Sequence, residues 1–252
     1  MTPGVAALLA GAGLVAGAVN AVAGGGSLIS FPALLAAGYP SVTANVTNTV
    51  ALFPGYAGSV VGGRPELVGQ AGRIRSIAIT SVLGAVVGAA VLLTTPGDVF
   101  RELVPYLILL ACVLLVFQPR LARIVKARQD GATGDLSVVL QAGVFLAAMY
   151  GAYFGAGLGV LLLGILGIFL HERLQRVNAL KNVLSLIING VALVAFGVFG
   201  PVAWDAVLVI ALASLAGGYL GARIARRLPA GLLRAAVVTY GVVVAVILLV
   251  RG

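Results

Sequence analysis

Polar side chains gather in two short stretches of an otherwise apolar sequence. In the first stretch Asn45 and Asn48 stand three residues apart, with Thr47 between them. In the second, Asn178 and Lys181 have the same spacing, which in a helix places both side chains on one face. Amide and hydroxyl groups can donate hydrogen bonds to an oxyanion, and a lysine beside apolar segments must pair, reach the membrane surface or meet an anion. These stretches predict a binding site for a small anion.

A glycine-rich interruption precedes each polar stretch. The interruptions are Gly24-Gly25-Gly26-Ser27 and Gly155-Ala156-Gly157-Leu158-Gly159. Because glycine costs about 1 kcal/mol in a helix interior, each interruption should split a membrane segment into half-helices. The free N–H groups at the start of a half-helix carry partial positive charge and can hold an anion. The alternative is a flexible turn that only lets two helices approach closely.

The predicted substrate-binding residues combine the polar positions with the glycine interruptions. They are Asn20, Gly24, Gly25, Gly26, Ser27, Asn45, Thr47, Asn48, Tyr153, Gly155, Gly157, Asn178, Lys181 and Asn182. For Lys181 the alternative is a side chain that extends to the nearby loop. For Tyr153 the alternative is packing at the membrane interface.

Several kinds of chemistry lack the residues they need. His171 is the single histidine and Cys112 the single cysteine, so we expect neither a metal site nor a disulfide. Ser27 has no base placed to activate it as a nucleophile, so we expect no enzyme and no cofactor. No acidic residue falls in the middle of a predicted span, and the coupling ion is not identified by the sequence.

The composition is that of a polytopic membrane protein. Of 252 residues, 61% are hydrophobic and 9% charged, whereas soluble domains have about 25% charged residues. Basic residues outnumber acidic ones by 16 to 7, but they lie in short loops between apolar runs. They therefore indicate topology and lipid headgroup contacts, and we expect the lipid bilayer and not a nucleic acid as partner.

Ten apolar segments predict an all-α fold. They are Val5–Val22, Leu28–Ala37, Thr43–Val61, Ile74–Leu93, Leu103–Phe117, Leu136–Phe154, Leu158–Leu170, Val177–Phe199, Ala203–Ala222 and Leu232–Val250. A helix needs about 20 apolar residues to cross a bilayer. The second and seventh segments are too short to cross straight, and we expect them to be broken or re-entrant.

The basic loops predict the orientation. The residues that define these four loops are Arg64, Arg73 and Arg75; Arg120, Arg123, Lys126 and Arg128; Arg173 and Arg176; and Arg223, Arg226, Arg227 and Arg234. If every segment crosses, all four loops lie on one face, which the positive-inside rule makes cytoplasmic. Both termini are then outside. The N-terminus lacks a basic start and reads as a first membrane segment that is retained.

The two halves of the chain share a motif. SVLGAVVGA, from Ser81 to Ala89, and SLAGGYLGA, from Ser214 to Ala222, match at an offset of 133 residues. We divide the chain into a first repeat (1–118), a cytoplasmic linker (119–135) and a second repeat (136–252). Each repeat holds five segments, an odd number, so the repeats should have inverted topology with broken helices near the midplane. For the motif alone, ordinary close helix packing is the alternative.

Two longer stretches resemble the TauE/SafE sulfite exporter family. They are AGGGSLISFPALLAAGYPSVTANVTNTVALFPG (23–55) and FGAGLGVLLLGILGIFLHERLQRVNALKN (154–182). The resemblance implies transport of sulfite, sulfoacetate or another organosulfonate through the bacterial inner membrane. The halves differ at one position, because Thr47 in the first corresponds to Lys181 in the second, and only the second supplies a cation.

We therefore expect a secondary transporter, an exporter of a small sulfur-containing anion, that works by alternating access. A passive anion channel, an uptake permease for another small anion and a scaffold subunit without a substrate are the alternatives. A homodimer is left open.

Overall fold

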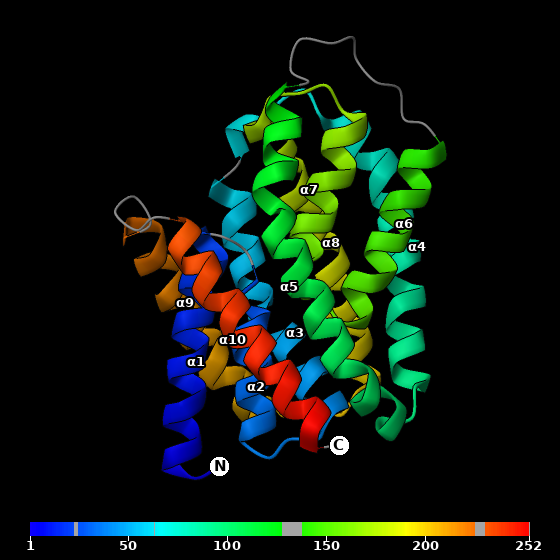
Figure 1. Ribbon diagram of the computed structural model, residues 1–252. Coiled ribbons are helices and arrows are strands. Elements are labelled where there is room, and N and C mark those ends of the chain that lie inside the picture. The colour runs from blue at the N-terminus through cyan, green and yellow to red at the C-terminus, as the bar shows by residue number, and fades with distance from the viewer. Residues whose placement is uncertain (23–24, 63, 128–137, 225–229, 252) are drawn as a thin grey trace.

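The computed structural model describes residues 1–22, 25–62, 64–127, 138–224 and 230–251, and every element in these ranges is helical (Figure 1). The elements are α1 (Pro3–Val22), α2 (Ser27–Ala36), α3 (Ser41–Gly62), the 3-10 turn η1 (Arg64–Leu67), α4 (Ala71–Thr94), α5 (Gly97–Ala127), α6 (Val138–Tyr153), α7 (Leu158–Phe169), α8 (Leu174–Phe199), α9 (Trp204–Ile224) and α10 (Ala230–Arg251). The all-α prediction is confirmed, and each predicted segment corresponds to one helix.

The longest helix, α5, differs most from its predicted segment. It begins at Gly97 and continues to Ala127, whereas the apolar run covers only 103–117. Asp98 in its first turn favours the early start, because a carboxylate stabilises the N-terminal end of the helix dipole. The first part of the predicted linker, 119–127, is therefore helical, and the rest of it lies outside the described residues.

Four of the described helices are long and apolar enough to cross a membrane, namely α1, α4, α5 and α8. Both termini lie at one end of the bundle, while η1, the starts of α4 and α8 and the end of α5 lie at the other (Figure 1). The described arginines of the first three basic loops belong to these elements or to the turn before α8. The positive-inside rule predicts that this end faces the cytoplasm.

Glycines of α4 let it pack directly on the backbone of α6. A Cβ added to Gly84 would lie 2.4 Å from the carbonyl oxygen of Phe145. A Cβ added to Gly88 would lie 2.1 Å from the carbonyl oxygen of Met149. Both distances are far shorter than any side chain tolerates, so these glycines are required by helix packing.

The same contact recurs between α1 and α9. A Cβ on Gly217 would lie 1.9 Å from the carbonyl oxygen of Leu14, and one on Gly17 would lie 2.1 Å from that of Ser214. The end of the motif, 221–222, lies beyond the described side chains. Each of these two pairs therefore joins a helix of the first half to a helix of the second half.

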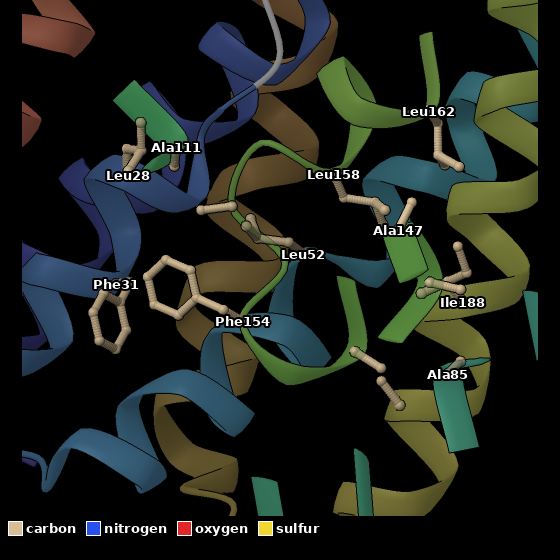
Figure 2. Close-up of a cluster of buried hydrophobic side chains, with 14 of the residues drawn as sticks. Leu28, Phe31, Leu52, Ala85, Ala111, Ala147, Phe154, Leu158, Leu162 and Ile188 are labelled. Atoms are coloured by element: carbon tan, nitrogen blue, oxygen red, sulfur yellow. The ribbon is translucent and has the colours of Figure 1, made fainter. Parts of the chain in front are cut away.

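The two short helices occupy opposite halves of the bundle, with α2 nearer the termini and α7 nearer the basic loops (Figure 1). With 10 and 12 residues they span about 15 and 18 Å, roughly half of a 30 Å hydrocarbon core. Figure 2 shows the ring of Phe154, just before α7, against Phe31 of α2. These rings meet edge to face with centroids 5.4 Å apart, so the two broken segments contact each other directly.

Candidate functional site

Both glycine interruptions line one cavity of about 340 Å³. The remaining wall comes from α1, α3, α5, α7, α8 and α10. The polar side chains that line it are Asn20, Ser27, Tyr56, Ser59, Gln118, Asn178, Lys181, Asn182, Ser185 and Arg234. Two of these carry positive charge, and its described lining residues include no Asp or Glu. The cavity therefore favours an anion.

Glycines and the Asn20 side chain stabilise the backbone conformation of the first interruption. Gly25 has φ +92°, which favours glycine, and a Cβ there would lie 2.7 Å from a methyl group of Leu115 on α5. The N–H of Gly26 donates a 2.7 Å hydrogen bond to Oδ1 of Asn20. Asn20 thus fixes the chain where α2 begins.

The second interruption has two glycines with positive φ, Gly155 at +80° and Gly157 at +81°. The Tyr150 hydroxyl donates a 2.7 Å hydrogen bond to the carbonyl oxygen of Ala156 and holds the turn in place. Within the described residues, the N–H groups of Gly157 and Gly159 have no hydrogen-bond acceptor. Since α7 starts here, these donors carry the partial positive charge of a helix N-terminus.

Lys181 of α8 lies beside this helix start. A Cβ on Gly159 would be 3.9 Å from the Lys181 ammonium nitrogen. No carboxylate in the described part of the chain pairs with that ammonium group. The Lys181 ammonium and the partial positive charge at the start of α7 repel each other. A bound anion between them would be attracted to both, so their proximity favours an anion site.

Ser185 follows Lys181 by one helical turn on the same face of α8. Its side chain lines the cavity, is only 2% exposed, and its Oγ lacks a hydrogen-bond partner among the described residues. A buried hydroxyl without a partner is unfavourable, so it indicates a group that a ligand would satisfy.

Eight of the predicted binding residues lie together around this cavity. They are Asn20, Gly25, Ser27, Gly155, Gly157, Asn178, Lys181 and Asn182. Gly26 contributes its N–H to Asn20 and does not line the cavity. Gly24 lies outside the described residues.

Thr47 and Asn48 lie elsewhere, at buried positions of α3. Asn48 Oδ1 accepts a 2.5 Å hydrogen bond from the Ser30 hydroxyl of α2, and Thr47 Oγ1 accepts one of 3.0 Å from the N–H of Ala203. Both side chains connect α3 to neighbouring segments, and neither lines the cavity.

Asn45 and Tyr153 form a further connection, and neither residue lines the cavity. The Asn45 Nδ2 group donates a 2.8 Å hydrogen bond to the carbonyl oxygen of Tyr153, at the end of α6. The Tyr153 ring packs edge to face on Phe100 with centroids 5.7 Å apart. This places Tyr153 in an aromatic contact between α5 and α6.

The sequence did not indicate five polar residues of the cavity, namely Tyr56, Ser59, Gln118, Ser185 and Arg234. Ser185 could have been found, because it lies four residues after Lys181 on the same helical face. Arg234 resembled a topology signal in a basic loop. Its Nε instead donates a 3.2 Å hydrogen bond to Gln118 Oε1 on α5. Among the described residues no group of three or more His, Cys, Asp or Glu side chains could hold a metal ion.

Comparisons with known proteins agree with a membrane transporter. The chain is 28% identical over 241 residues to a "Probable membrane transporter protein ORF9" of Sinorhizobium sp., covering 94% of this chain and 90% of that protein. A "Probable membrane transporter protein" of Haemophilus influenzae is 27% identical over 217 residues, covering 86% and 84%. The "Probable membrane transporter protein YfcA" of Escherichia coli K12 is 29% identical over 216 residues, covering 85% and 77%. No solved structure matches the chain significantly.

The family model described as "Sulfite exporter TauE/SafE" matches residues 9–248, which is nearly the whole chain and includes both glycine interruptions and the cavity between them. The protein is a membrane transporter, and the chain belongs to the TauE/SafE sulfite exporter family.

Proposed function

We propose that the cavity binds a small sulfur-containing anion, which the protein exports across the bacterial inner membrane by alternating access. The observation that carries this proposal is the position of the Lys181 ammonium beside the start of α7, where two backbone N–H groups have no acceptor among the described residues. A sulfite or sulfonate group has three oxygens that accept hydrogen bonds. Lys181, these N–H groups and the Ser185 hydroxyl supply the donors.

The polarity of the cavity supports an anion as the transported species. Both charged groups on its wall are cations, and the neutral polar groups include the hydroxyls of Tyr56 and Ser59 and the amides of Asn178 and Asn182. A cation would find no carboxylate among the described lining residues. The choice of sulfur chemistry comes from the family, and the geometry supports the wider class of oxyanions.

Access from one side supports an alternating mechanism. The cavity wall includes Ala122, near the end of α5, and Leu174, the first residue of α8. These two helix ends lie at the bundle end that carries the basic loops (Figure 1). On the opposite side of the interruptions, Phe31 and Phe154 pack against each other at 2% and 3% exposure. If the basic end is cytoplasmic, the cavity opens inward, as an exporter requires for loading.

The inverted repeat would supply the second state. In the structure α1 packs on α2 and α9 much as α6 packs on α7 and α4, and α9 packs on α3 as α4 packs on α8. We infer that exchanging the two sets of contacts would close the cavity and open an equivalent path at the other end.

A transport assay in proteoliposomes tests the proposal. Labelled sulfite or sulfoacetate is loaded inside, and efflux is measured with and without unlabelled anion outside. We expect saturable flux that external anion accelerates, and a loss of about tenfold or more in Lys181→Gln because a charged hydrogen bond is removed.

Arg123→Gln is the matched control, since Arg123 is exposed on α5 and does not line the cavity. It should behave as wild type. Flux that never saturates and ignores external anion would indicate a channel. Equal flux in Lys181→Gln and wild type would overturn the proposed site.

A further inference from the structure

Arg234 is a second cation on the cavity wall, and the anion site around Lys181 leaves it unused. It comes from α10, and its Nε donates to Gln118 Oε1 at 3.2 Å. A guanidinium has five N–H donors, so four remain after this bond. No ion pair to Arg234 occurs within the described ranges. Gln118 therefore positions a planar cation whose other donors are available to a ligand.

The position of Gln118 along α5 sets the depth of this second cation. A Cβ added to Gly157 would lie 3.2 Å from a methyl group of Leu114, and one added to Gly25 would lie 2.7 Å from a methyl group of Leu115. This part of α5 is therefore level with both interruptions. Gln118 follows by three to four residues, which is about 5 Å along the helix axis. Arg234 is thus attached one turn nearer the basic end than the start of α7.

The cavity is also larger than sulfite needs. Sulfite has four non-hydrogen atoms, and it would leave most of the 340 Å³ empty, given that a water molecule takes about 30 Å³ of liquid. Val160, Leu163, Pro119 and Ala122 contribute apolar surface to the same wall. A short carbon chain can pack against such surface while both of its ends meet cations.

We propose that Arg234 and Gln118 form a second anion-binding position, which holds a carboxylate and so selects, among the sulfonates that the proposed function already includes, those that carry both groups. This rests on the proposed anion site at Lys181. The free N–H groups and ammonium at the start of α7 suit a sulfonate with oxygens in three directions. The planar guanidinium suits a carboxylate, which it can bind through two parallel hydrogen bonds.

Binding of a matched pair of ligands tests this assignment. 3-Sulfopropanoate and 1-propanesulfonate have similar size, but only the first carries a carboxylate. In calorimetric titrations of the detergent-purified protein, we expect wild type to bind the dianion about tenfold or more tightly, as one charged hydrogen-bonded pair allows. Arg234→Gln should lose this preference and keep its affinity for propanesulfonate.

Further variants separate the possible failures. Arg234→Lys should restore part of the preference, because it returns the charge without the planar fork, and Arg123→Gln should keep all of it. If Arg234→Gln weakens both ligands equally, Arg234 only attracts anions to the mouth and the inference is wrong. A wild type without preference would also overturn it.

Failure of the underlying anion site gives a different result. In that case neither ligand binds wild type, or Lys181→Gln binds both as well as wild type does. If the anion site is correct and the second position is not, Lys181→Gln weakens both ligands while Arg234→Gln changes no preference.

Discussion

Ser185 is buried at the cavity wall with a hydroxyl that lacks a partner in the described part of the structure. Ser185→Ala should leave the thermal unfolding midpoint unchanged or raise it, because an unsatisfied buried polar group is removed. The same change should weaken sulfite binding about threefold to tenfold, because one hydrogen bond to the ligand is lost. Thermal unfolding and calorimetry on the same samples measure both effects. Unchanged affinity would exclude Ser185 from the site.

For Asn48→Ala we expect the opposite pair of effects, a loss of stability without a loss of sulfite affinity. Asn48 Oδ1 accepts the hydrogen bond of the Ser30 hydroxyl between two buried helix positions. Asn48→Ala removes the shorter of two hydrogen bonds of that hydroxyl, whose other acceptor is the Gly26 carbonyl oxygen at 3.3 Å. We therefore expect the free energy of unfolding to fall by about 1 kcal/mol and sulfite affinity to stay near the wild-type value. Denaturant or thermal unfolding, with calorimetry, measures the two effects.

Thr49→Val is the control for Asn48→Ala, because in the described part of the chain the Thr49 hydroxyl donates a hydrogen bond only to the Asn45 carbonyl oxygen of the same helix, α3. Thr49→Val should lower the free energy of unfolding less than Asn48→Ala does. If Asn48→Ala abolished binding in a protein of normal stability, Asn48 would belong to the binding site, as its sequence context predicted.

The sequence could not separate these two asparagine sets. Asn45 with Asn48, and Asn178 with Asn182, each lie on one helical face. Spacing defines a face of a helix but not the neighbour that this face meets. In α8 the face meets the cavity, whereas in α3 it meets α2 and the end of α6.

At the scale of helices, Gly88 and Gly72 provide a matched pair on α4. A Cβ at Gly88 would collide with the Met149 carbonyl oxygen, whereas one at Gly72 would meet nothing within 4 Å. Gly88→Ala should destabilise the protein by about 1 to 3 kcal/mol through overpacking. Gly72→Ala should be neutral or stabilising, since alanine favours helix by about 1 kcal/mol.

Thermal unfolding in one detergent compares the two variants directly. Equal effects of both substitutions would mean that α4 and α6 do not pack as closely as the structure shows.

The number and order of the helices were predictable because apolar runs and the glycine and proline interruptions determine where a membrane chain must fold into helix. The helix partners were predictable only in part. The shared small-residue motif indicated close contacts, but nothing in the motif specifies that α4 meets α6 and α9 meets α1. The full length of α5 was missed, because charged residues beyond an apolar run can still form helix.

At the scale of the molecule, the cavity should be accessible from one side only. With Cys112 replaced by alanine, Ser59→Cys introduces a thiol at an exposed cavity position. A membrane-impermeant thiol reagent should modify it in inside-out vesicles and not in intact cells, if the basic end is cytoplasmic. Mass spectrometry of the purified protein measures the modification.

Gly97→Cys is the control for orientation, because Gly97 is exposed at the end of the bundle that carries both termini. It should react in intact cells instead. If Ser59→Cys reacts in intact cells and Gly97→Cys in inside-out vesicles, the orientation is the reverse of the predicted one. Modification of Ser59→Cys from both sides would indicate an open channel.

The contact between α1 and α9 also bears on how the protein is made. Gly17 and its neighbour Ser214 are separated by about 200 residues, which a ribosome adds in roughly 10 to 40 s. The contacting residues of α4 and α6 are separated by only about 60 residues, which take roughly 3 to 12 s to synthesise. Although α1 is made before α4, it therefore meets its partner α9 later than α4 meets α6. Of these two pairs, α4 and α6 then assemble first, and a chain that stops before α9 leaves the glycine face of α1 without its partner helix.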